Sequence, residues 1–195
     1  MHQTPTRAAL VAGVLVAAVG VLGACSPGAD QPAAPLPASP SPSPSPTPDA
    51  QERESVEAAE QTLQDFYELG AKVGNDGFVN WQVMQGFWTD DEQWQAQQAT
   101  YEQRVADGWT TEGAATFTDV QASDFDPGGD EPGDERVTLE VCNDTSGVTT
   151  LDKDGAKVPR AEGVPERFTV VYTMSARGED RWGIDSREAD TEESC

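Results

Sequence analysis

The sequence predicts an α+β domain, because helical and strand periodicities occupy separate parts of its last 145 or so residues. Apolar residues recur at steps of three and four up to about residue 108, and at steps of two beyond it. Helices followed by a run of strands are typical of helices packed on one face of an antiparallel sheet. About 145 residues are also enough for one domain with its own core. We therefore expect a single domain over residues 51–195, with N-terminal helices on a bent antiparallel sheet.

Three helical segments are expected before the strands. Over Glu52–Val73 apolar side chains recur at helical spacing, and a Gly-Asn-Asp-Gly segment then ends the helix. The second segment, Phe78–Trp88, places large apolar side chains at steps of three and four. The acidic segment Thr89–Glu92 supplies a cap and a negative first turn for a third helix, which ends near Gly108.

Strands are expected in the rest of the domain. Apolar and polar residues alternate over Val137–Val141 and over Phe168–Met174, as in half-buried strands. Shorter strands are expected at 116–125 and 182–185. Residues 148–158 predict a small hairpin around a tight Asp-Gly turn.

The N-terminus has the pattern of a secretory signal. The first seven residues carry one firm positive charge, at Arg7, and an uncharged stretch from Ala8 to Ala24 follows. The stretch ends in Leu22-Gly23-Ala24-Cys25, which resembles the lipobox of bacterial lipoproteins in all four positions. This resemblance implies cleavage before Cys25 and acyl chains such as palmitate on the new N-terminal cysteine. Residues 1–24 are then the signal peptide.

Two forms of membrane attachment are compatible with this N-terminus. An uncleaved signal anchor is the alternative to lipidation, although an apolar stretch of about 17 residues is near the lower limit for spanning a bilayer. Two or three acyl chains hold a protein stably on a membrane, whereas one chain is marginal. We expect the chain on the extracytoplasmic face of the cell membrane, with the membrane as its partner through Cys25.

Residues 25–50 read as the lipidated cysteine and a disordered linker. Nine of the 14 prolines lie between Pro27 and Pro48, among Ser, Ala and Thr. Such a composition lacks the apolar residues whose burial offsets the entropy cost of folding. In polyproline II, at about 3.1 Å per residue, this segment reaches roughly 75 Å. A spacer is the prediction, and a glycosylated stalk or a ligand for proline-binding grooves stays open.

The cysteine count predicts a disulfide. If Cys25 carries lipid, Cys142 and Cys195 remain, an even pair in an oxidising compartment. A bond between them closes a loop of about 54 residues and contributes roughly 4 kcal/mol in the chain-entropy model. The alternative, two free thiols for metal or redox chemistry, lacks a Cys-x-x-Cys spacing.

The order of elements resembles two groups of proteins. Three helices with aromatic stripes and then four to five strands resemble the cone-shaped, cystatin-like fold of nuclear transport factor two-like and ketosteroid isomerase-like proteins. More closely, the layout resembles small actinobacterial lipoproteins of uncharacterised function. The shared features are a strand cysteine, an Asp-Gly hairpin, an Arg/Trp-containing last strand and a terminal cysteine, here Val141-Cys142, Asp154-Gly155, Arg181-Trp182 and Cys195. The resemblance implies the cone-shaped fold and carries over no catalytic residue.

Composition excludes several kinds of chemistry. The single histidine, His2, lies in the predicted signal peptide, so the mature chain has none. This excludes histidine bases, Ser-His-Asp and Cys-His nucleophiles, and imidazole metal ligands. Glycine loops of the Walker or dinucleotide type do not occur. The formal net charge of −23 argues against nucleic acid as a partner, and no cofactor is expected.

Carboxylates and phenols are the remaining candidates for chemistry. Four residues follow an EF-hand-like spacing, but strands flank them and we interpret the segment as a polar loop without metal: Asp124, Asp126, Gly129 and Glu135. Five more have the side chains used by carboxylate-dependent isomerases, and none is assigned as catalytic: Asp65, Tyr67, Tyr101, Tyr172 and Asp185.

Aromatic residues on the predicted elements suggest either a pocket or a packed core. The candidate pocket lining is Phe66, Trp81, Trp88, Tyr101 and Tyr172. Our hypothesis is a non-enzymatic, lipid-anchored domain that binds a small apolar ligand or an envelope protein. The alternatives are a histidine-independent isomerase or dehydratase with a buried carboxylate of raised pKa, and a passive envelope domain.

Overall fold

The computed structural model describes residues 48–129, 133–178 and 181–195. The predicted signal peptide, Cys25 and nearly all of the predicted linker lie outside the described residues. Among the helices that are described, none has the length and apolar character needed to cross a membrane. The described residues belong to one compact unit, Pro44–Cys195.

Three helices on the N-terminal side of the described chain confirm the helical segments. They are α1 (Pro48–Asn75), the 3-10 helix η1 (Trp81–Phe87) and α2 (Asp91–Ala106). α1 begins at Pro48, inside the predicted linker, because proline fits the first turn of a helix, where its missing N–H group has no partner to lose.

Local sequence explains how the two later helices begin and turn. Asp90 caps α2, since its side chain accepts a hydrogen bond of 2.8 Å from the Gln93 backbone N–H. η1 differs from the expected helix in its tighter turn, in which side chains three residues apart lie above one another. Met84 is the residue of η1 that the core buries completely.

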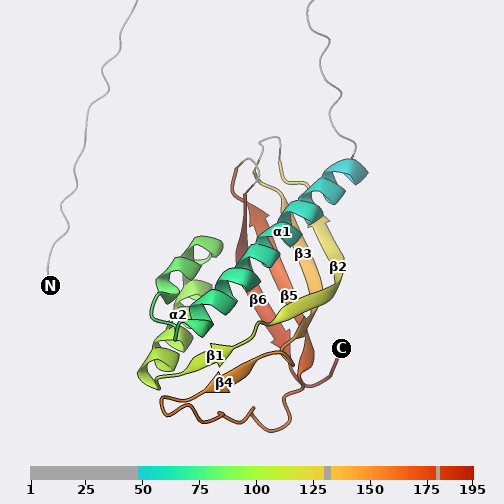
Figure 1. Cartoon of the computed structure of the whole chain (residues 1–195). Helices are drawn as coiled ribbons and strands as arrows, with labels where there is room; N and C mark the ends of the chain where they lie inside the picture. Colours follow the sequence, from blue (N-terminus) through green and yellow to red (C-terminus); the bar gives the residue numbers. More distant parts are fainter. Residues whose placement is uncertain (1–47, 130–132, 179–180) are drawn as a thin grey trace, which may run out of the picture. The chain divides into compact units, whose positions relative to one another are not determined.

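Four antiparallel strands form the main sheet, in the order β2-β3-β5-β6. Their bounds are Thr116–Asp126, Arg136–Asp144, Arg167–Ala176 and Trp182–Asp190. The expected α+β class, with N-terminal helices packed against a bent antiparallel sheet, is therefore confirmed (Figure 1). β6 is longer than predicted because it pairs with β5 along its whole length, from Trp182 opposite Ala176 to Asp190 opposite Thr169.

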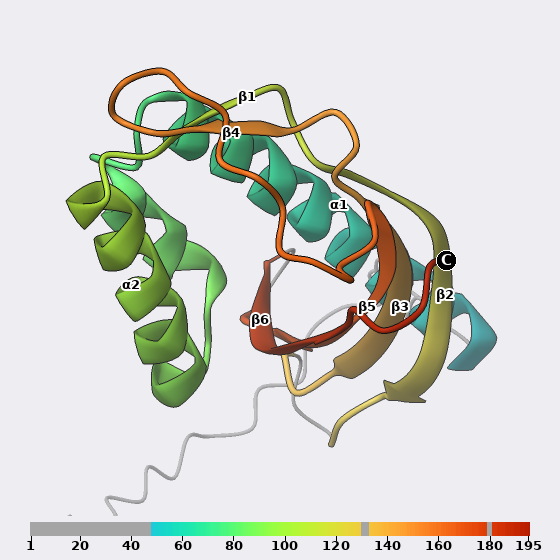
Figure 2. The same cartoon turned by 90° about the horizontal axis from the view of Figure 1, so that it is seen from below.

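The bend of the sheet coincides with irregular pairing. Between β2 and β3 the register shifts twice, between Thr118 and Gln121 and between Ala122 and Asp124. Asp119, in the first of these shifts, has a φ of 53°. Such bulges bend a strand and increase its twist. The curved sheet is seen end-on in Figure 2, with α1 crossing one of its faces.

A second, two-stranded sheet lies outside the main sheet. β1 (Thr110–Glu112), which sequence patterning does not predict, pairs with β4 (Thr149–Leu151). The predicted Asp-Gly turn follows β4, with Gly155 at a φ of 77° and a hydrogen bond of 2.9 Å from the Val158 N–H to the Thr150 carbonyl. The second arm of this hairpin is only an isolated bridge, so the hairpin is shorter than expected.

The core lies between α1, η1 and the inner face of the main sheet. On this inner face, alternate residues of β3 and β5 are buried, and Leu63 of α1 packs among them. Every described residue that belongs to the core or packs against it lies between Val56 and Ile184. We therefore expect residues 44–195 to fold without the rest of the chain.

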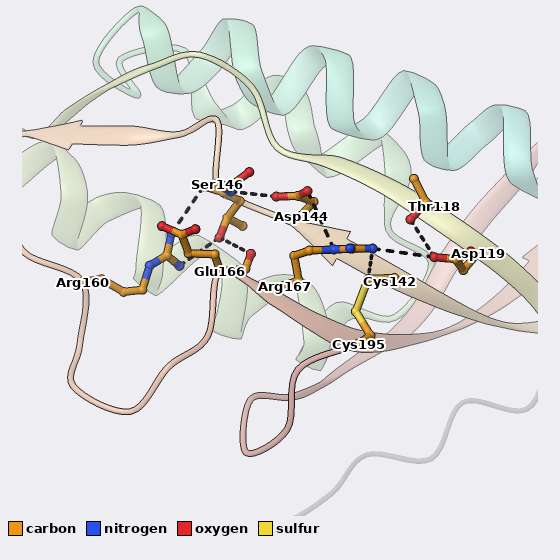
Figure 3. Close-up of polar contacts among 10 residues, drawn as sticks. Thr118, Asp119, Cys142, Asp144, Ser146, Arg160, Glu166, Arg167 and Cys195 are labelled. Carbon is orange, nitrogen blue, oxygen red and sulfur yellow. Dashed lines mark hydrogen bonds and ion pairs between the residues drawn. A yellow bond between two sulfur atoms is a disulfide. The ribbon is translucent and has the colours of Figure 1, made fainter.

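The two cysteines of the domain join the C-terminus to the sheet. The Sγ atoms of Cys142, on β3, and Cys195 lie at disulfide distance, 2.07 Å apart. The Arg167 guanidinium donates a hydrogen bond of 3.2 Å to Cys142 Sγ. It also lies 3.7 Å from Asp119 and 3.8 Å from Asp144, so the disulfide is flanked by a small charged cluster (Figure 3).

Candidate functional site

A half-open cavity of about 360 Å³ lies where α1, α2, the small β1-β4 sheet and the main sheet meet. Its lining combines side chains from nearly every element of the domain, including η1, β3, β5 and β6. Volumes of this order, about 300 to 1,000 Å³, are typical of sites for small molecules. The cavity is therefore the first candidate for a functional site.

Small residues on α1 make the space. Gly70, Ala71 and Gly74 all line the cavity. A Cβ atom added at Gly70 would meet only Met84 Cε, at 3.8 Å, whereas one at Gly74 would collide with Thr111 Oγ1. Glycine inside a helix costs about 1 kcal/mol relative to alanine. The two glycines are thus locally unfavourable; Gly70 leaves room beside Met84, and Gly74 lets Thr111 approach the helix closely.

Aromatic rings form much of the apolar wall. Phe66 makes edge-on contacts with Phe87 and Tyr172, at centroid distances of 5.5 and 6.5 Å. Tyr101 of α2 stacks on Trp81 at 6.0 Å with an interplanar angle of 11°. Offset and edge-on contacts of this kind hold rings in fixed orientations. The wall is consequently preformed.

A chain of four hydrogen-bonded groups runs through the polar part of the lining. The Arg187 Nε–H donates to the Tyr172 hydroxyl at 3.2 Å. The Tyr172 and Tyr67 hydroxyls lie 3.0 Å apart, and the Tyr67 hydroxyl donates to Asn143 Oδ1 at 3.0 Å. Since each phenol has one proton, Tyr172 must donate to Tyr67. Asn143 itself is buried, and this bond satisfies its carbonyl oxygen.

Burial keeps two phenols of the cavity, those of Tyr67 and Tyr101, neutral. It raises the pKa of Tyr67 far above the ordinary value, and Tyr172 raises it further. Burial also raises the pKa of Tyr101. Phenols with raised pKa values stay protonated at neutral pH, so they act as hydrogen-bond donors and not as bases.

Two arginines, Arg104 of α2 and Arg187 of β6, line the cavity. The Arg104 guanidinium lies over the Phe78 ring, 5.0 Å from its centroid, and that of Arg187 lies 6.0 Å from the Tyr172 centroid. Burial lowers the pKa of Arg104; Tyr101 opposes this shift and the charge of Arg187 adds to it. Both side chains remain cations at neutral pH because an arginine pKa starts above 12.

Acidic groups are missing from the part of this lining that the structure describes. The ion pairs found among the described residues involve other bases, namely Arg136, Lys153 and Arg167. The cavity therefore combines an apolar wall with two positive charges that have no described carboxylate beside them.

Three of the five predicted lining residues, Phe66, Tyr101 and Tyr172, line the cavity. The described lining of this cavity does not include the other two, Trp81 and Trp88. The tighter turn of η1 directs Trp81 against α2, where its ring contacts Trp94 at 5.7 Å as well as Tyr101. Trp88 is 4% exposed and pairs with Ile184 of β6 in an isolated bridge, so it belongs to the core.

The two carboxylates of the type used by carboxylate-dependent isomerases, Asp65 and Asp185, lie elsewhere. Asp65 is exposed on α1, where it accepts a hydrogen bond from Gln61. The Asp185 carboxylate accepts hydrogen bonds from the Ser175 hydroxyl, at 2.7 Å, and from the Thr89 hydroxyl. It also forms an ion pair with Arg136 at 3.3 Å. These contacts attach the segment before α2 to β6. Neither carboxylate belongs to the described cavity lining.

The EF-hand-like residues do not converge where they are described. Asp124 and Asp126 lie on β2 opposite Thr138 and Arg136, and Asp126 accepts a hydrogen bond of 3.0 Å from the Gly128 N–H. Residues 130–132 of this loop lie outside the described part. Within that part, no group of three or more His, Cys, Asp or Glu is placed to hold a metal ion.

The cavity residues that the sequence analysis did not single out include the two arginines and Asn143. Arg187 lies in the polar half of β6, where apolar alternation is absent, and Arg104 is one of several charged residues near the end of α2. Comparisons of the chain with protein-family models, curated proteins and solved structures find no match.

Proposed function

We propose that this chain is a lipid-anchored domain of the cell envelope that binds a small apolar ligand in the cavity between α1, α2 and the sheets. The observation that carries the proposal is the half-open cavity of about 360 Å³, with an aromatic wall preformed by ring contacts. Binding of an envelope protein is the alternative. A cone-shaped, cystatin-like fold is part of the proposal, and α1 on a bent sheet supports it.

A binding role accounts for the cavity better than an isomerase or dehydratase role. Both reactions need a group that removes a proton from substrate. The lining that the structure describes offers protonated phenols and guanidinium groups instead of a carboxylate. These groups can orient and hold a ligand, but they cannot accept its proton at neutral pH.

Filling the cavity should abolish binding without unfolding the domain. In Gly70→Leu the new side chain projects from α1 past Met84, and leucine favours a helix by about 1 kcal/mol over glycine. We expect residues 44–195 to bind the neutral fluorescent probe N-phenyl-1-naphthylamine. In Gly70→Leu the affinity for the probe should fall by about tenfold or more. A tenfold fall corresponds to a loss of about 1.4 kcal/mol of binding free energy. The measurements are a fluorescence titration and a thermal unfolding curve.

Gly70→Ala is the matched control, because its single methyl group makes only ordinary contact with Met84. It should bind the probe nearly as the unmodified domain does. Failure of the unmodified domain to bind the probe, or equal binding by the leucine variant, would contradict a ligand site in this cavity.

The lipobox-like sequence at Leu22–Cys25 supports the proposed anchor. In a bacterial host Cys25→Ala should leave an unlipidated, uncleaved precursor, because the thiolate that accepts the lipid is gone. Metabolic labelling with palmitate and the apparent mass on a gel report the two steps. Ser26→Ala serves as the control and should be labelled normally. A cleaved Cys25→Ala product that still fractionates with membranes would rule out lipid anchoring through this residue.

A further inference from the structure

We infer that the ligand of the cavity is a small amphipathic acid, with its apolar body on the aromatic wall and one anionic head group bound by Arg104 and Arg187. This inference rests on the proposed binding function and names the class of ligand.

The distribution of charge is the first argument. The chain has 35 acidic residues and 12 basic ones, so carboxylates are available to nearly any arginine. Two of the twelve basic side chains nevertheless line one cavity, whose described lining holds no carboxylate. A cation in a partly desolvated site is unfavourable unless an anion accompanies it. An anionic ligand supplies the negative charge that the described lining lacks.

The hydrogen-bonding capacity of the two arginines is the second argument. Arg187 uses Nε for Tyr172, and its two Nη groups make no hydrogen bond to a described residue. The side chain of Arg104 makes none within the described chain, and its guanidinium lies over the Phe78 ring. A guanidinium offers two parallel N–H groups that match the two oxygens of a carboxylate. Both side chains thus retain donors for a head group.

The rest of the lining suits the apolar body of such a ligand. Phe66, Tyr101 and Tyr172 provide ring faces and edges, and Gly70 leaves open volume beside them. The cavity volume of 360 Å³ corresponds to about a dozen water-sized groups at about 30 Å³ each. This size fits a chain of medium length or one or two rings.

The fixed hydrogen bonds make the head-group site preorganised. Tyr172 is held by Tyr67, and Tyr67 by Asn143 on the neighbouring strand β3. Tyr172 in turn holds Arg187 through Nε, so the orientation of that guanidinium is already set. A ligand then loses little affinity to ordering the side chains that bind it.

Three probes with one apolar body test the head group: octanoate, octanol and octylamine, titrated calorimetrically into residues 44–195 at pH 7. We expect octanoate to bind about tenfold or more tightly than octanol, with octylamine the weakest. A second series with a 3-phenylpropyl body distinguishes a chain-like ligand from a ring-bearing one. Preference for the acid in either series supports the inference.

Variants assign the preference to the two arginines. Arg104→Gln, which removes no described hydrogen bond, should weaken octanoate binding by about tenfold and leave octanol binding unchanged. Arg187→Gln should act in the same direction, with thermal unfolding as a check because it also loses the bond to Tyr172. Arg53→Gln, an equal change of charge at an exposed position of α1, should alter neither.

Three other outcomes would each reject a different part of the inference or of the proposed function. Equal affinity for octanoate and octanol would reject an acidic ligand and leave the proposed binding function standing. An acid preference that survives both Arg104→Gln and Arg187→Gln would reject the assignment to these arginines. Absence of binding by all probes of both series would reject the ligand class together with the proposed function.

Discussion

Replacing Cys142 and Cys195 together with serine should lower the free energy of unfolding of residues 44–195 by about 4 kcal/mol in the chain-entropy model. The bond spans a sequence separation of 53 residues, so its removal gives the unfolded chain much more conformational freedom. The unfolding temperature should fall by roughly 10–15 °C for a domain of this size. Calorimetry or denaturation in urea measures the change.

The folded state should lose contacts as well. Asp190 is the last residue of β6, and Cys195 is exposed, so the disulfide is the main described attachment of the final residues to the sheet. Cys142 is 4% exposed and would be replaced by a buried hydroxyl beside Arg167. Reduction of the unmodified domain by dithiothreitol is the matched control, since both sulfur atoms remain. An unfolding midpoint that is the same with and without dithiothreitol would contradict a stabilising bond.

Leu63→Ala should destabilise the domain by about 2–5 kcal/mol, the usual range for a leucine removed from a packed core. Leu63 is 0% exposed and lies on the face of α1 that packs against the sheet. The loss combines the transfer free energy of the missing methine and methyl groups with the cavity that they leave. Urea denaturation followed by tryptophan fluorescence measures it, with the slope of the transition unchanged if only the stability differs.

Leu69→Ala on the same helix is the control, because Leu69 is only partly buried. It makes the same chemical change and should cost about 1 kcal/mol, near the centre of the range for point substitutions. Comparable losses for the two variants would mean that α1 does not pack through the face described here. Leu63 is outside the cavity lining, so Leu63→Ala should still bind the neutral probe well below its unfolding temperature.

Periodicity predicted the larger elements because burial on one face leaves a repeating signal in the sequence. The helix of Glu52–Val73 and the strands around Val137 and Val170 each present apolar residues to the same core. Patterning failed where an element is held by pairing alone. β1 consists of Thr110–Glu112 and exists because β4 lies beside it, while the second half of β6 is polar and is defined by its register with β5.

For a related reason, the sequence pattern predicted only part of the candidate site. Aromatic residues at helical spacing marked Phe66 and Tyr101, yet the same spacing included Trp81, which packs between α2 side chains instead. Nothing in the spacing of Arg104 and Arg187, 83 positions apart, shows that both line one cavity. Both line it because α2 and β6 are in contact in the folded domain.

By itself the sequence determined the fold class, the places of the four main-sheet strands and the cysteine pair that lies at disulfide distance, since each depends on local periodicity or on counting. It also shows that His2 is the single histidine of the chain. Only the tertiary structure decided that Gly70 lines a cavity, that Tyr67 and Tyr172 share a hydrogen bond and that two arginines line the same cavity without a described carboxylate. These are relations between residues far apart in the chain, and they exist only once the core has closed around them.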